Sequence, residues 1–184
     1  MDFSDALQLV TGEVADTLGA VACRDAEELA DLIGKSRRVF VCGQGRSGLV
    51  ARAFGMRLTH LGLTVHVAGE TTAGAIGRGD LFVAVSCSGS TDITCLTASK
   101  AKAAGATCVG VVGRRRCRLA RLSGHTLVVP TPSKARKRSG ESAQFGSSLF
   151  EQCSLLLLDA LCLMLGRRLK QSHARMLARH SNLE

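Results

Sequence analysis

Apolar residues along the chain follow two spacings, one typical of helices and one typical of buried strands. Over residues 5–18 and 25–33 they recur every three or four positions, which predicts two helices, the second ending at Gly34. Short, mostly apolar runs follow at 39–42, 64–67, 81–86, 107–112 and 126–129, with helical patterns between them. Continuous apolar runs are typical of parallel strands that are buried on both faces. A strongly apolar helix is expected over 147–170, followed by a short final helix.

Five strands that alternate with helices predict an α/β fold, with a parallel sheet covered by helices on both faces. The strand order 2-1-3-4-5 fits right-handed crossovers best, because it places a switch point between the first and third strands. We expect one domain over residues 1–184, a three-layer sandwich of the flavodoxin-like type. Its N-terminal helices would span 1–34 and its C-terminal helices 147–184.

Two turns rich in small residues leave the first and third strands at this switch point. Residues 43–48 read Gly-Gln-Gly-Arg-Ser-Gly and residues 86–91 read Ser-Cys-Ser-Gly-Ser-Thr, and each turn precedes a helix. Backbone N–H groups at a helix start, together with clustered hydroxyls, can surround a phosphate. One such turn is commonly an ordinary helix cap, but two at adjacent strand ends favour a phosphate site.

The first turn also matches the dinucleotide-binding pattern, and Glu70 lies close to where a ribose-binding acid would fall. A dinucleotide enzyme needs a substrate domain as well, for which 184 residues leave no room. The net charge of +9 suits phosphorylated ligands and nucleic acid alike. Because there is no Trp or Tyr for base stacking, a nucleic-acid partner is not expected, and Lys134–Arg138 is interpreted as a cationic loop.

The eight cysteines are scattered without a C-x-x-C pair, which indicates neither a metal site nor a disulfide framework. They are interpreted as reduced thiols of a cytoplasmic protein. The longest apolar stretch, Leu155 to Leu165, is interrupted by Asp159 and is too short to span a membrane. Its helix is apolar on all sides and so needs cover. We therefore expect self-association into a dimer or tetramer through the C-terminal helices.

The two turns resemble those of the sugar isomerase (SIS) domain. Residues 56–62, 69–72, 150–151 and 179–183 narrow the resemblance to the 6-phospho-3-hexuloisomerase family, and the likeness extends over almost the whole chain. The resemblance implies conversion of D-arabino-hex-3-ulose 6-phosphate into fructose 6-phosphate, as in the ribulose monophosphate pathway of formaldehyde fixation or in pentose synthesis. No metal or redox cofactor is expected. Another SIS-domain sugar-phosphate isomerase, or a non-catalytic sugar-phosphate sensor, remains an alternative.

Substrate-binding roles follow from the resemblance. Gly45 and Arg46 would line the sugar, Ser47 would assist in holding the phosphate, and Glu70 is a weaker candidate for binding a hydroxyl. The second turn is expected to hold the phosphate, through Ser86, Ser88, Gly89, Ser90 and Thr91.

Catalytic roles follow in the same way. Glu151, near the start of the long apolar helix, is the expected base that removes a proton to form an enediol. A 3-ketone phosphorylated at O6 stays open-chain, so no acid is needed to open a ring. His60 and His180 are instead the candidates for moving a proton between O2 and O3. The tail that carries His180 must then fold into an active site, which a neighbouring subunit could provide.

Overall fold

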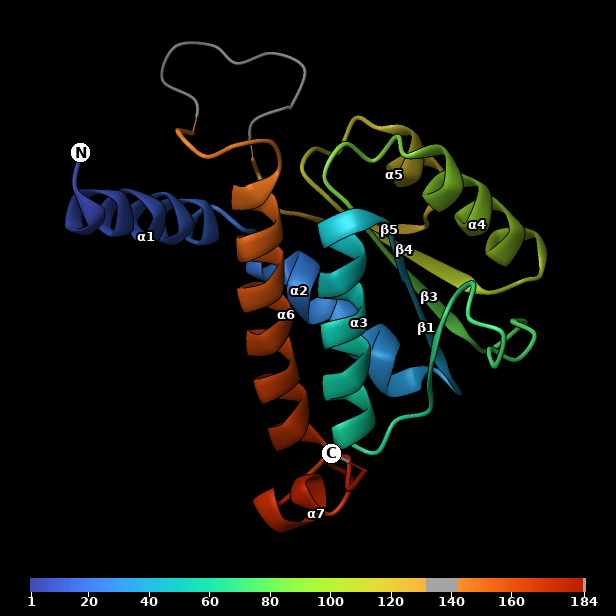
Figure 1. The fold of residues 1–184 in the computed structure, drawn as a ribbon. Coiled ribbons are helices and arrows are strands. Elements are labelled where there is room, and N and C mark those ends of the chain that lie inside the picture. The colour runs from blue at the N-terminus through green and yellow to red at the C-terminus, as the bar shows by residue number, and fades with distance from the viewer. Residues whose placement is uncertain (132–141, 184) are drawn as a thin grey trace.

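The computed structural model describes residues 1–131 and 142–183, and its elements are labelled in Figure 1. In chain order they are α1 (Phe3–Gly19), α2 (Cys23–Lys35), β1 (Val39–Gly43), α3 (Gly45–His60), β2 (Val65–Val67), β3 (Leu81–Ser86), α4 (Asp92–Ala103), β4 (Thr107–Val112), α5 (Arg118–Leu122), β5 (His125–Val128), α6 (Ser148–Arg168) and α7 (His173–Leu177). The cationic stretch Lys134–Arg138 lies outside the described residues.

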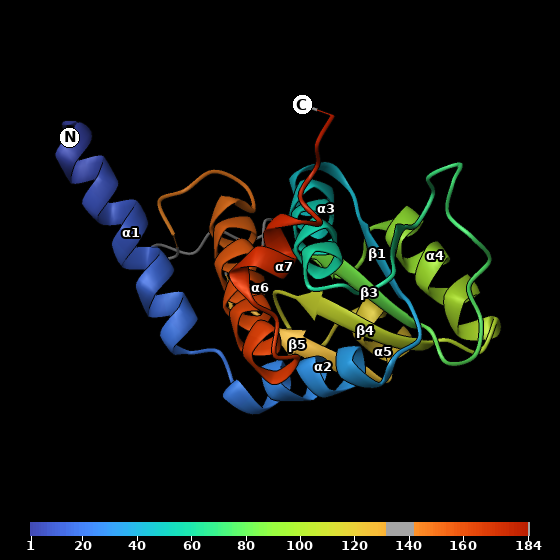
Figure 2. The same ribbon diagram turned by 90° about the horizontal axis from the view of Figure 1, so that it is seen from below.

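The five strands form one parallel sheet in the order β2-β1-β3-β4-β5, which confirms the predicted fold and topology. Successive side chains of a strand point to opposite faces. On β1, Val39 and Val41 therefore join the core under α2, α3 and α6, while Phe40 and Cys42 join the core under α4 and α5. Figure 2 shows the sheet between these two helical layers. Burial on both faces explains why the central strands read as unbroken apolar runs.

The long helix α6 is a core helix of the domain. By length and composition it could cross a membrane. However, it packs along α3, and its side chains Phe150, Leu158 and Leu165 are buried in the core. Its outer face leaves Leu156 and Leu163 exposed. The chain itself therefore buries only one side of this apolar helix.

Several element ends differ from the sequence-based expectation by one or two residues. Helix α2 continues through Gly34 to Lys35, and Ser36 ends it by donating a side-chain hydrogen bond to the carbonyl oxygen of Ile33. The prediction that Gly34 ends this helix was wrong, because a helix end needs partners for its last carbonyls rather than a glycine. Strand β5 begins at His125 and ends at Val128.

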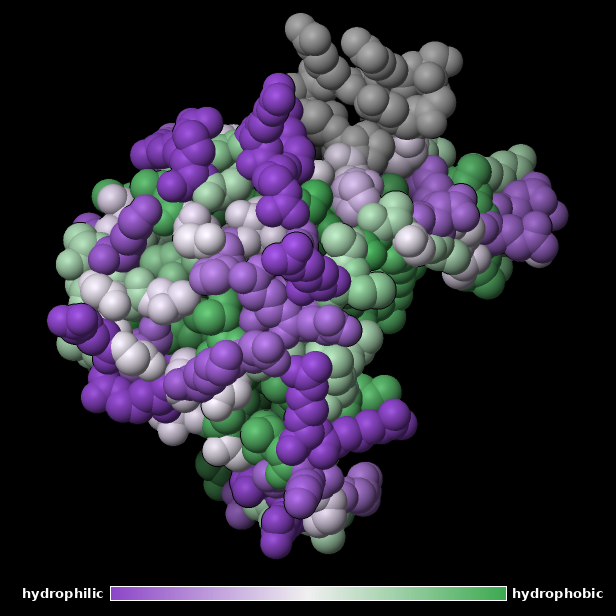
Figure 3. Space-filling model, turned by 180° about the vertical axis from the view of Figure 1, so that it is seen from behind, coloured by the Kyte–Doolittle hydropathy of each residue, from purple (hydrophilic) through white to green (hydrophobic). Residues whose placement is uncertain are grey.

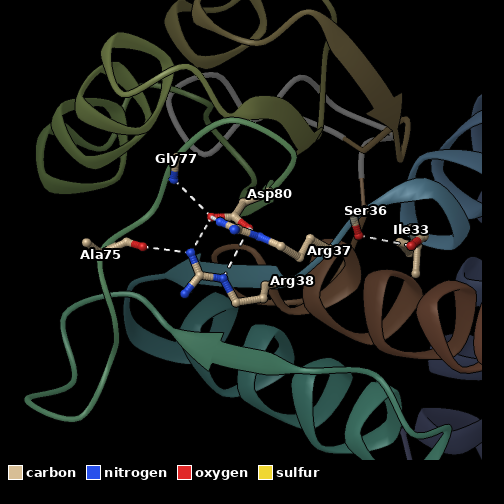
Figure 4. Close-up of polar contacts among 7 residues, drawn as sticks. All are labelled: Ile33, Ser36, Arg37, Arg38, Ala75, Gly77 and Asp80. Carbon is tan, nitrogen blue, oxygen red and sulfur yellow. Dashed lines mark hydrogen bonds and ion pairs between the residues drawn. The ribbon is translucent and has the colours of Figure 1, made fainter.

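A buried carboxylate fixes the edge of the sheet opposite the two turns. Asp80 precedes β3 and accepts hydrogen bonds from Arg38 Nη2 at 2.6 Å, from Arg37 and from the backbone N–H of Gly77 (Figure 4). The hydrogen bond from Arg38 is the main reason that the pKa of Asp80 lies well below its usual range. Arg38 also donates to the carbonyl oxygen of Ala75. Asp80 thus joins the starts of β1 and β3 to the connection between β2 and β3.

Candidate functional site

The two predicted turns emerge side by side at the carboxyl edge of the sheet, because β1 and β3 are hydrogen-bonded neighbours with Gly43 opposite Val85. Helix α3 begins at Gly45, immediately after β1. A Cβ on Gly43 would lie 2.7 Å from the carbonyl oxygen of Ser47, and one on Gly48 would lie 2.8 Å from that of Gly43. Only glycine lets the strand end and the helix start approach so closely.

The second turn gathers hydroxyl groups between β3 and α4. Ser86 Oγ and Thr91 Oγ1 lie 3.2 Å apart, and Ser88 Oγ accepts a hydrogen bond from the backbone N–H of Ser90. Gly89 has a φ of +58°, and any side chain on it would overlap the sulfur of Cys117. The turn therefore depends on a glycine at this position. Hydroxyls and backbone N–H groups in such an arrangement can bind an anion from several sides.

At the helix starts beside the two turns, no side chain accepts a hydrogen bond from the first backbone N–H groups. Gln44, Thr91 and Ser147 precede α3, α4 and α6 and make no capping hydrogen bond through their side chains. Helices α1, α5 and α7 are capped by side chains, whereas α2, which starts away from the turns, is also uncapped. The buried Ser147 Oγ also has no hydrogen-bond partner among the described residues. Free N–H groups and the partial positive charge of three helix starts favour a bound anion here.

The candidate base lies beside the first turn. Glu151 is 8 % exposed and sits one turn into α6. Arg46, from the first turn of α3, places its Nε 3.2 Å from Glu151 Oε2 and donates from Nη1 to Ser148 Oγ at 2.8 Å. Arg46, Glu151 and Leu155 line an open groove of about 290 Å³ between α3 and α6. An arginine at a helix start is disfavoured by the positive end of the helix dipole. The ion pair with Glu151 offsets this cost for Arg46.

Glu70 lies on the other side of the first turn. Its carboxylate pairs with Arg52 of α3, and both side chains line a polar cavity of about 320 Å³ together with Gly43 and Gly45. The structure thus brings Glu70 next to the first turn, and the second turn does not line this cavity.

The two candidate histidines lie together, but at the far end of α3. Their rings stack with centroids 5.2 Å apart, and Arg179 donates to the carbonyl oxygen of His60. Burial lowers the pKa of His60, and the charges of His180 and Arg57 lower it further. Because α3 rises 1.5 Å per residue, the pair lies about 22 Å from Gly45. Within one chain, the histidines are therefore remote from Glu151.

Sequence reasoning missed Ser147 and Ser148, which bring the start of α6 to the site. Their signal was visible, because two serines directly before an apolar helix are typical of a helix start. The tertiary contact between Ser148 and Arg46 joins residues 102 positions apart and had no local signal.

The fold and the site define a three-layer α/β protein with a candidate phosphate site at the switch point of its sheet. The sequence model of the SIS domain matches residues 32–161. The chain belongs to the SIS domain family.

Individual relatives narrow the similarity and confirm the resemblance to 6-phospho-3-hexuloisomerases. The chain is 40 % identical over 183 residues to a 3-hexulose-6-phosphate isomerase of Mycobacterium gastri, covering 100 % of this chain and 92 % of that protein. It is 32 % identical to the isomerase of the same name from Bacillus subtilis, with 95 % of each chain covered. A crystal structure of a protein from Methanococcus jannaschii, described as implying 3-hexulose-6-phosphate isomerase function, has a TM-score of 0.85 at 27 % identity and covers 98 % of this chain and 99 % of its own.

Proposed function

We propose that this protein is a 3-hexulose-6-phosphate isomerase, which converts D-arabino-hex-3-ulose 6-phosphate into fructose 6-phosphate. The observation that carries the proposal is the arrangement of two hydroxyl-bearing turns and three uncapped helix starts beside one buried carboxylate, Glu151. The name shared by two of the relatives supports the choice of sugar.

The substrate phosphate binds at the second turn in this proposal. The hydroxyls of Ser86, Ser88 and Thr91 donate to its oxygens, Gly89 and Ser90 shape the turn around it, and Ser47 assists from α3. Arg46 and Gly45 line the sugar chain. Glu70 has the weaker role of binding a sugar hydroxyl from the adjoining cavity.

Glu151 acts as the base in the proposed reaction. It removes the proton from C2 of the 3-ketose, and the electrons form an enediol whose oxygens are O2 and O3. The carboxylic acid so formed then returns a proton to C3, while the hydroxyl proton on O2 is transferred to O3 to give the 2-ketone. Arg46, which already pairs with the carboxylate, holds it beside the groove between α3 and α6.

We propose further that the histidine pair acts in the site of a neighbouring subunit. His60 and His180 cannot reach Glu151 of their own chain, since about 22 Å of α3 separates them from its N-terminus. The groove beside Glu151 is open toward one face of α3 and α6. On this face the side chains of Leu49, Leu156 and Leu163 are exposed to solvent. A second chain packed on this face would both bury these leucines and bring a histidine to O2 and O3.

The remaining parts of the proposal follow from the same assignment. Residues 1–184 act as one SIS domain, self-associated through the α6 face, in formaldehyde fixation by the ribulose monophosphate pathway. All eight cysteines are free thiols and seven of them are buried, which suits the reducing cytoplasm.

Deuterium exchange gives a direct test. In D₂O the reverse reaction removes the proton on C3 of fructose 6-phosphate, so we expect the H3 signal in the ¹H NMR spectrum to disappear. An aldose–ketose isomerase would instead exchange a proton on C1. Glu151→Gln should slow the exchange by about 10²- to 10⁴-fold, the usual contribution of a general base.

The matched control is Glu27→Gln, because Glu27 is an exposed carboxylate on α2. It should leave the exchange rate unchanged. Binding of fructose 6-phosphate without exchange at C3 would reject the isomerase and leave a sugar-phosphate sensor. Full exchange by Glu151→Gln would reject Glu151 as the base.

A further inference from the structure

Two cavities adjoin each other at the carboxyl end of β2. The polar cavity of about 320 Å³ lies between the first turn and Glu70. A second cavity, of about 440 Å³, lies between the β2–β3 connection and α4. Ala68, Gly69 and Glu70 line both, so the two cavities form one recess with a polar and an apolar part. Each part has the size of a small-molecule site, about 300–1,000 Å³.

The second cavity is lined mostly by apolar side chains. They are Phe40 and Phe82 of the sheet, Ala73, Ala75 and Ile76 of the β2–β3 connection, and Ala101 and Ala104 of α4. Figure 1 shows that this connection contains no helix, so that part of the sheet is covered only by a loop. On the face of the molecule shown in Figure 3, by contrast, hydrophilic side chains lie over much of the surface. Such a lining suits a flat apolar group, because the hydroxyls of a sugar would lack partners there.

The first turn carries glycines in the three positions that nucleotide-binding turns use. In such turns the first glycine makes the turn tight, the second lets a phosphate approach the backbone, and the third lets the helix pack closely on the strand. A Cβ on Gly43 or Gly48 would lie 2.7 or 2.8 Å, respectively, from a backbone oxygen. Gly45 is different, because its φ is +57° and a Cβ on it would meet nothing within 4 Å. The backbone at Gly45 is therefore open to a ligand.

Glu70 lies where the polar and apolar parts of the recess meet. In folds of this type, an acid near the end of the second strand accepts hydrogen bonds from the hydroxyls of a ribose. Glu70 follows β2, its side chain is 44 % exposed, and Arg52 of α3 holds its carboxylate. A ribose at Glu70 would have the first turn on one side and the apolar cavity on the other.

These features together define a ligand with a phosphate, a ribose and a flat base. We propose that the recess binds adenosine 5′-phosphate (AMP), with its phosphate at the first turn, its ribose at Glu70 and its adenine in the apolar cavity. Adenine has no carbonyl group, so fewer of its polar atoms than those of guanine would lack partners in this lining. The second turn lines neither cavity and stays free for a sugar phosphate, so the proposal does not rest on the isomerase activity.

Calorimetry on the full chain tests the proposal, with AMP as the probe. We expect saturable binding at one site per chain. 2′-Deoxy-AMP should bind about 10-fold more weakly, because it lacks a hydroxyl that donates to a carboxylate. Ala73→Trp fills the apolar cavity and should raise the Kd for AMP at least about 10-fold, with no change in the Kd for fructose 6-phosphate. The matched control is Ala103→Trp, at an exposed position of α4 outside the cavity, which should change neither Kd.

Three results would each overturn the proposal. The first is the absence of AMP binding at millimolar concentration. The second is equal affinity for AMP and 2′-deoxy-AMP, a comparison that uses the unaltered chain and so holds even if Ala73→Trp does not fold. The third is AMP binding that Thr91→Val weakens and Ala73→Trp leaves unchanged, because the phosphate of AMP would then occupy the second turn.

Discussion

The hydroxyl of Thr91 tests the phosphate site at the scale of one residue. It lies 3.2 Å from Ser86 Oγ and makes no capping hydrogen bond to α4, so it contributes little to the fold. Thr91→Val keeps the shape of the side chain and removes one donor to a charged group. A hydrogen bond of this kind is worth about 1.5–3 kcal/mol. We therefore expect the Kd for fructose 6-phosphate, measured by calorimetry, to rise roughly 10- to 100-fold.

The matched control is Thr107→Val at the exposed start of β4. It should change neither the Kd nor the melting temperature appreciably. An unchanged Kd for Thr91→Val would show that the phosphate does not bind at the second turn. A large loss of melting temperature in this variant would instead show that Thr91 has a structural role.

At the scale of the elements, Asp80 is the polar group on which the amino edge of the sheet depends. Asp80→Asn removes the charge that two arginines share and leaves Arg38 without its partner. Breaking a buried ion pair costs about 3 kcal/mol or more, although the exposure of Arg37 keeps this case at the lower end. A loss of about 3 kcal/mol corresponds to a melting temperature lower by about 6–12 °C in a domain of this size.

The effect of Asp80→Asn should depend on pH in a defined direction. Because the pKa of Asp80 is lower in the folded than in the unfolded protein, the carboxylate stabilises the fold above its ordinary pKa of about 4. That contribution is lost as the pH falls through the folded value. The difference in the free energy of unfolding between wild type and variant should thus be largest at neutral pH and should decrease in acid. Asp16→Asn, at an exposed site, should show no such trend, and a constant difference for Asp80→Asn would contradict this account.

The elements themselves could be predicted from the sequence because local patterns encode them. Apolar runs gave the five strands, and the two glycine turns between strand and helix gave the switch point and so the strand order. The Asp80 network was beyond such reasoning, since it joins residues 42 and 43 positions apart through tertiary contacts. The same limit applies to the pairing of Arg46 with Glu151. Sequence also gave no measure of the separation between His60 and Glu151, because that distance depends on which ends of α3 and α6 lie together.

At the scale of the whole molecule, the separation of the histidines from Glu151 determines how many chains the proposed site needs. Helix α3 has the two glycine-containing turns near its N-terminus and the histidine pair at its C-terminus. Two chains packed antiparallel along α3 and α6 would place each end beside the opposite end of its partner. A two-fold axis does this for both sites at once, because such an interface uses the same surface on both subunits.

Mixing two inactive variants tests this arrangement. Glu151→Gln and His180→Ala should each lose most of the isomerase activity, since each removes one half of every site. In a mixed dimer, however, one of the two sites combines an intact Glu151 with an intact His180 from the other chain. Random exchange of subunits makes about half of the dimers mixed, so roughly a quarter of the wild-type sites should be restored. Exchange is started by dilution and reassociation and followed by the C3 deuterium assay. Wild-type chains treated in the same way report any loss from the procedure. If the mixture stays inactive after exchange is complete, the histidine and the carboxylate do not meet across subunits. Full activity of His180→Ala alone would show that His180 has no part in the reaction.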